Sequence, residues 1–218
     1  MKNGALSRAI FMIAASALGA LSLTQSAQAT TLVELTTDQL VFGSDAVIRG
    51  KVVEVWTEQD ERGVVWTRAQ VAVEQTYKGD KSQTAYIIDQ VGGTWGKAHT
   101  VVHGAARFSA DEEVVLFLEK LGNGKVVPVG MTQGKYTVRL DPYSREMLVQ
   151  QFAPAPTQDY DHRFIPLPKA ESRNFLADLE DQISNRLTAG WDGEPIPGTT
   201  LERLERINPT TTPVEVKR

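Results

Sequence analysis

The residues best suited to chemistry in this sequence are its histidines, an acidic triplet and a glycine-rich segment around one tryptophan. His99 and His103 lie four residues apart, a spacing that would place two imidazoles on one face of a helix, where they could share a metal ion. Thr100-Val101-Val102 separates them and Gly104 follows, so we expect an extended segment with the two rings about 13 Å apart. We therefore interpret the pair as polar surface residues and expect no metal or other cofactor.

The acidic triplet Asp111-Glu112-Glu113 offers a second chemistry. Two carboxylates held several ångströms apart across a cleft can hydrolyse glycosidic bonds. An acidic chain also has such clusters on its surface, and this triplet precedes an apolar run, so we favour a solvated turn before a buried strand. No serine stands in a Gly-x-Ser-x-Gly turn, the elbow that exposes a hydrolase nucleophile. We assign no catalytic residue, and a hydrolase using Asp111, Glu112 or His103 stays as the alternative function.

The segment Gly92-Gly93-Thr94-Trp95-Gly96 combines backbone freedom with a large aromatic side chain. It lacks the Lys and Ser/Thr order of a phosphate-binding loop. We expect a loop that begins here and extends to about Phe108. Its glycines could let the chain cross one end of the fold while Trp95 covers the core. Because aromatic side chains on the loops of a rigid scaffold commonly bind ligands, the alternative is a binding site formed by Gly93, Trp95, His99 and His103.

The elements that position these residues follow a segment typical of a secretory signal peptide, assigned to residues 1–29. Lys2 and Arg8 accompany an apolar run from Ala9 to Leu23, and Ala27-Gln28-Ala29 is a small-x-small cleavage site. The apolar run is shorter than the roughly 20 residues that a membrane-spanning helix needs. We therefore expect a periplasmic or secreted protein that begins at Thr30 after cleavage and has no membrane attachment.

The remaining chain is acidic and contains no cysteine. The whole sequence has a net charge of −4, and loss of Lys2 and Arg8 with the signal peptide makes it more negative. Such a chain lacks the basic surface that drives nucleic-acid binding, and it is repelled by anionic lipids. Without cysteine it has no disulfide, thiol nucleophile or thiolate metal site. Its length suits one domain whose stability depends on the core.

The hydrophobic pattern predicts a mainly β fold, a small antiparallel OB-like barrel of five or six strands over residues 30–151. Thr36 and Gln39 form a capping-box pattern, which predicts a short N-terminal helix. The unbroken apolar row from Val114 to Leu118 indicates a strand covered on both faces. The expected strands are 46–56, bent near Gly50, and 65–77, 84–91, 112–121, 125–129 and 134–140, with a further short strand at 146–150.

The composition changes after Phe152. Four prolines between residues 154 and 168 mark a linker, assigned to residues 152–168, that cannot enter a sheet or helix interior. Leu179, Ile183 and Leu187 recur at helical spacing and predict an amphipathic helix over 169–189 that ends at Gly190. Residues 190–218 are mostly polar or proline, with Leu201, Leu204 and Ile207 able to form only a weak helical turn, and we expect a largely disordered tail.

Three blocks occur in an order that resembles the netrin-like domain, the OB-type barrel found in tissue inhibitors of metalloproteinases. They are Ser44 to Val53, Val71 to Gly79 with its Tyr77-Lys78-Gly79 ending, and Asp111 to Lys120. The resemblance covers roughly residues 30–140. The chain is also similar to a group of uncharacterised exported bacterial proteins that share a Gly-Gly loop and a Gln-Gly-Lys segment, here Gln133-Gly134-Lys135.

The resemblance implies that the mature N-terminus inhibits a metalloprotease. In the inhibitors, the amine and carbonyl of an N-terminal cysteine chelate the protease zinc, and disulfides hold that end in place. Here Thr30 and Thr31 would stand at the mature end, without the preorganisation that disulfides supply. We therefore expect a non-catalytic binding module that recognises a protein or an extracellular polymer, and its sharpest form is a metalloprotease inhibitor acting through Thr30 and Thr31.

Overall fold

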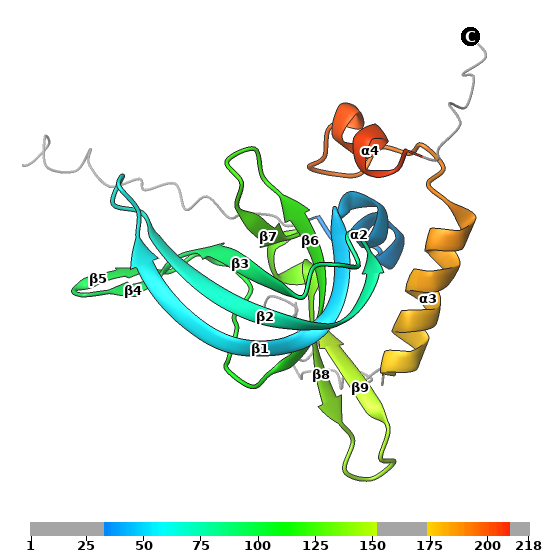
Figure 1. The fold of residues 1–218 in the computed structure, drawn as a ribbon, viewed down its shortest axis with the longest axis horizontal. Coiled ribbons are helices and arrows are strands. Elements are labelled where there is room, and N and C mark those ends of the chain that lie inside the picture. Colours follow the sequence, from blue (N-terminus) through cyan, green and yellow to red (C-terminus); the bar gives the residue numbers. More distant parts are fainter. Residues whose placement is uncertain (1–32, 152–173, 210–218) are drawn as a thin grey trace, which may run out of the picture. The chain divides into compact units, whose positions relative to one another are not determined.

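The computed structural model describes residues 33–151 and 174–209. This part of the chain is mainly β, with a seven-stranded antiparallel sheet, a separate two-stranded hairpin and three α-helices (Figure 1). None of the helices in the described ranges is long and apolar enough to cross a membrane. The predicted signal peptide, Thr30 and Thr31, the linker 152–168 and residues 210–218 lie outside the described residues.

The main sheet has the strand order β3-β2-β1-β6-β8-β9, and β7 pairs with β6 outside this path. Between residues 33 and 151, hydrogen bonding does not close this sheet, since β3 and β9 stand at its two ends. The prediction of a mainly β fold is confirmed, and each expected strand, including the further short strand at 146–150, is present within a few residues of its predicted bounds. All seven strands belong to this one sheet, whereas a barrel of five or six strands was expected. The strands are β1 (Ala46–Gln59), β2 (Val65–Lys78), β3 (Ala85–Val91), β6 (Glu113–Lys120), β7 (Val126–Pro128), β8 (Lys135–Leu140) and β9 (Met147–Gln151).

The long strands β1 and β2 are strongly curved (Figure 1). Their pairing shifts register at three places, one of them between Arg49 and Gly50, and such bulges increase the local twist and bend of a strand. A Cβ on Gly50 would lie 2.2 Å from the carbonyl oxygen of Ala72, so only glycine fits the bend predicted there. Strict alternation along β2 would put Tyr77 on the face of Val73, but with these bulges Tyr77 packs against the core under the helices and Val73 against the opposite core.

The central strand β6 is buried on both faces, as its apolar row predicts. Val114 to Leu118 are each at most 1% exposed. Val115 and Phe117 belong to the core that the helices cover, whereas Val114, Leu116 and Leu118 belong to a second core on the opposite face, as the two-residue period of a strand requires. Leu140 is 57% exposed because it lies beyond the last residue of β8 that pairs with β6.

Two predicted helices are present, and their ends follow from local signals. α2 (Thr37–Gly43) begins at the expected capping box, in which Gln39 N donates to Thr36 Oγ1 (3.3 Å) and Thr36 N donates to Gln39 Oε1 (3.0 Å). α3 (Leu176–Ala189) buries Leu179 and Ile183 and ends at Gly190, which has φ +80°. Its first turn begins later than the predicted residue 169, and residues 169–173 lie outside the described ranges.

The prediction of a disordered tail is wrong for residues 191–209. The helical turn predicted at Leu201, Leu204 and Ile207 is present as α4 (Leu201–Ile207). Trp191, Ile196 and Leu204 are buried in the core with α2 and α3. Arg203 Nη1 donates to Gly43 O (2.7 Å) and Asn208 Nδ2 donates to Phe42 O (2.9 Å). These bonds satisfy carbonyl groups at the C-terminal end of α2 that the helix itself leaves unpaired. A few spaced apolar side chains and two side-chain caps therefore hold a segment whose composition is mostly polar.

Candidate functional site

Three of the residues predicted to bind a ligand, Gly93, Trp95 and His99, lie in a β-hairpin. β4 (Gly93–Trp95) pairs antiparallel with β5 (Ala98–Thr100), and Gly96 and Lys97 form the turn between them. Gly96 has φ +58°, a value that two-residue hairpin turns favour. The expected loop from Gly92 to Phe108 is therefore wrong over residues 93–100.

The hairpin is held at its base by β1 and β2. Thr67 Oγ1 donates to Gly92 O (2.7 Å), and Thr57 Oγ1 donates to Thr94 O (2.8 Å). Gly93 has φ +130°, and a Cβ there would lie 2.5 Å from Thr67 Oγ1. The role of Gly93 is therefore to allow this close approach, which fixes the hairpin against the long strands.

The predicted binding residues do not converge on one face of the hairpin. Trp95 is opposite Ala98 in the register, and Thr94 is opposite His99, with Thr94 Oγ1 and His99 Nδ1 2.8 Å apart. Successive strand residues point to opposite faces, so Trp95 and His99 are on different faces. His103 is exposed in the following loop. Trp95 is 46% exposed and belongs to neither core, which contradicts the interpretation that it covers the core.

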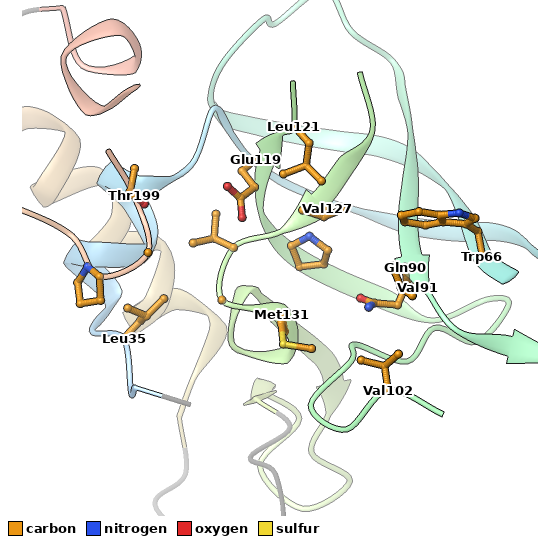
Figure 2. Close-up of a pocket in the computed structure, with 15 residues that line it drawn as sticks. Leu35, Trp66, Gln90, Val91, Val102, Glu119, Leu121, Val127, Met131 and Thr199 are labelled. Atoms are coloured by element: carbon orange, nitrogen blue, oxygen red, sulfur yellow. The ribbon is translucent and has the colours of Figure 1, made fainter. Parts of the chain in front are cut away.

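Figure 2 shows a groove of about 380 Å³ whose lining includes Val102, from the segment that follows β5. Trp66 and Gln90 are at one end of it, Leu35 and Thr199 are at the other, and Glu119 lies between them. The volume is within the range of about 300–1,000 Å³ typical of ligand sites. Most of its lining is apolar and includes Val91, Val102, Leu121, Val127, Pro128 and Met131.

The groove occurs where β3 and β7 face each other without a backbone ladder. Within residues 33–151, the backbone of β3 pairs only with that of β2, and the backbone of β7 only with that of β6. The side chain of Asp89 bridges the two strands, accepting from Val126 N at 3.2 Å and from Lys125 Nζ at 3.4 Å. The two strands are therefore linked by a side chain and not by a backbone ladder.

Glu119 is the one acidic residue among the described residues that line the groove. Its side chain is 26% exposed, and its nearest cation is Arg203, whose Nη2 is 3.8 Å away. Arg203 is already bound to Asp45 at 2.7 Å. Burial raises the pKa of Glu119; the charge of Arg203 opposes this effect and the charge of Asp45 adds to it. The carboxylate is therefore poorly compensated within the described part of the chain.

Each carboxylate of the acidic triplet is paired with a cation. Lys51 binds Asp111 at 2.7 Å, Arg49 binds Glu113 and Lys135 binds Glu112 at 2.6 Å. The Glu112 side chain is only 15% exposed, so the interpretation of a solvated turn is wrong for this residue.

The ionisation of Glu112 argues against an acid catalyst. Burial opposes its ionisation, but hydrogen bonds from Lys135 and Thr137 and the charge of Lys135 outweigh that effect and lower its pKa. A glycosidase general acid needs a raised pKa instead. The described residues contain no group of three or more His, Cys, Asp or Glu side chains that could hold a metal ion.

Glu119 was missed by the sequence analysis, although a signal for it exists. It continues the alternation of Val115 and Phe117, which places a carboxylate on an inward-facing position of a buried strand. An acid at such a position is unusual because burial of an unpaired charge is costly.

Comparison of the sequence with models of protein families and with curated proteins finds no match in either set. The netrin-like resemblance therefore stays a prediction. Any functional assignment depends on the geometry described above.

Proposed function

We propose that this chain is an exported, non-catalytic module that acts in the periplasm or outside the cell and binds a protein or an extracellular polymer through the β4–β5 hairpin. The observation that supports this proposal best is Trp95, which is 46% exposed on a hairpin held at its base by Thr57 and Thr67. A large aromatic side chain on a preorganised element gives contact area at a small cost in conformational entropy.

The test compares Trp95→Ala with Tyr143→Ala, a control that removes another exposed aromatic side chain, 90% exposed in the turn after β8. Immobilised mature protein captures partners from the native secretome and from a panel of extracellular polysaccharides, and each captured partner is then titrated. A central interface aromatic contributes about 2 kcal/mol or more, so Trp95→Ala should weaken binding by roughly 30-fold. Tyr143→Ala should bind as the wild type does. Equal affinity of the Trp95→Ala variant and the wild type would contradict the proposal.

We also propose that the seven-stranded sheet curves into an OB-like barrel. The proposal is supported by the Asp89 side chain, which links the end strand β3 to β7, the partner of the central strand β6. Nuclear Overhauser contacts between backbone protons of β3 and β7 are the expected observation. Their absence would favour an open sheet.

A narrower form of the function is inhibition of a zinc protease by the mature N-terminus. The supporting observation is the Gln133 side chain, whose Nε2 donates to Val33 O (2.9 Å) and whose Oε1 accepts from Leu35 N (2.7 Å). These bonds anchor the chain shortly after Thr30 and Thr31, which lie outside the described residues. Chelation needs a free α-amine, whose ordinary pKa is about 7.7–8.0.

Protein that starts at Thr30 is therefore compared with protein carrying one extra residue, against zinc proteases of the same secretome. Inhibition by the first version alone is expected. Equal inhibition by both, or by neither, excludes the chelating role.

A further inference from the structure

The groove contains a carboxylate without a close partner. Glu119 forms no hydrogen bond within the described residues and reaches only Arg203, at 3.8 Å. We propose that the groove binds an extended protein segment in which a lysine or arginine lies between apolar residues, and that Glu119 pairs with that basic side chain. Trp95 does not line the groove, so this proposal does not rest on the role of the hairpin.

Charge selects a basic guest. Arg203 Nη1 donates to Gly43 O and its Nη2 to Asp45, both at 2.7 Å, so Arg203 is held away from Glu119. A guest ammonium or guanidinium can approach to the roughly 2.7–2.9 Å of a charge-assisted hydrogen bond. An acidic guest would instead meet a carboxylate with the same sign of charge.

The indole at the other end of the groove does not compete for this cation. Lys125 Nζ lies 4.1 Å from the centroid of the Trp66 ring, so the face of that ring is already covered by a positive charge. Glu119 is therefore the position for the basic side chain, with Leu121, Val127 and Met131 available to apolar neighbours.

The length of the groove favours an extended segment over a small amine. Trp66 and Gln90 lie at one end of the groove and Leu35 and Thr199 at the other, with Glu119 between them (Figure 2). Successive side chains of an extended peptide point to opposite sides. A basic side chain can therefore meet Glu119 while its apolar neighbours contact the walls of the groove.

The experiment titrates the mature protein with blocked heptapeptides of alternating valine and lysine. Matched peptides carry glutamate or threonine in place of lysine, and n-butylamine serves as the small cationic probe. The lysine peptide should bind most tightly, and Glu119→Gln should weaken it at least about fivefold while leaving the threonine peptide unchanged. Glu54→Gln, which neutralises an exposed carboxylate on β1, and Trp95→Ala should both bind the lysine peptide as the wild type does.

A second variant tests the groove even if Glu119→Gln does not fold. Leu121→Lys adds a cation to the groove lining and should weaken the lysine peptide but not the glutamate peptide. The proposal is overturned if no peptide binds, if the glutamate peptide binds as well as the lysine peptide, if Glu119→Gln has no effect, or if n-butylamine binds as tightly as the peptide. Any of these results leaves capture that depends on Trp95 intact, so the two proposals fail separately.

Discussion

Replacing Lys135 by methionine tests whether the buried ion pair with Glu112 stabilises the sheet. The two side chains are 8% and 15% exposed, and Lys135 Nζ lies 2.6 Å from Glu112 Oε1. Methionine keeps most of the aliphatic stem, but Glu112 then retains only hydrogen bonds from Thr137 Oγ1 and Ser109 N. Removal of one partner from a buried pair costs about 3–5 kcal/mol. Because two hydrogen bonds remain, we expect a loss of about 3 kcal/mol.

The assay is urea unfolding followed by tryptophan fluorescence, with the free energy of unfolding from linear extrapolation. The double variant Lys135→Met/Glu112→Gln removes both charges and should lose about 1 kcal/mol, because replacing a whole buried pair is often nearly neutral. The double variant should therefore be about 2 kcal/mol more stable than Lys135→Met alone. A Lys135→Met loss under about 0.5 kcal/mol, or a double variant no more stable than Lys135→Met, would refute the reasoning.

The pair also predicts a pH dependence. The pKa of Glu112 is lower in the folded chain than its ordinary value, so the unfolded chain binds more protons in the acid range. Stability from Glu112 is therefore complete above the unfolded pKa and is lost as the pH falls through the folded pKa. Lys135→Met should remove much of this acid-side loss, which unfolding curves between about pH 6 and pH 3 would measure.

Three other substitutions test separate parts of the structure. Gly50→Ala should lower the free energy of unfolding in urea by at least about 2 kcal/mol, since the added Cβ would lie 2.2 Å from Ala72 O. Gly122→Ala is the control and should be neutral, because nothing lies within 4 Å of its Cβ. Equal effects of the two substitutions would contradict the role of Gly50 in the bend. Glu119→Gln should raise the melting temperature at pH 7, because a carboxyl group with a raised pKa destabilises the fold as the pH rises through its titration. The gain should vanish at acid pH. A melting temperature lowered at pH 7 would argue against the poorly compensated charge. Burial lowers the pKa of Lys78 to about 8, so above that pH the unfolded chain binds more protons than the folded chain. Stability should therefore rise between about pH 8 and 9.5. Lys78→Met should abolish this rise in stability, and an equal rise in the variant would assign it to another group.

Local patterns determined much of the fold. The capping box of α2, the end of α3 at Gly190, the bend at Gly50 and the two-sided burial of β6 were all predicted, because each depends on residues close together in the chain. A strand's two-residue period and a helix's capping side chains act over only a few positions. The strands were therefore predicted nearly completely, and the exposed position of Trp95 was one of two interpretations left open.

The tertiary structure decided which of these elements meet. The pair of Lys135 and Glu112 joins residues 23 positions apart, and the bond from Arg203 to Asp45 joins residues 158 positions apart. Periodicity indicates which residues of a strand face inward, but it contains no information on which distant cation approaches a carboxylate or which strand edges stay unpaired. For that reason the packing of α4 against α2, the bridge from Asp89 on β3 to β7 and the poorly compensated charge of Glu119 followed only from the folded chain.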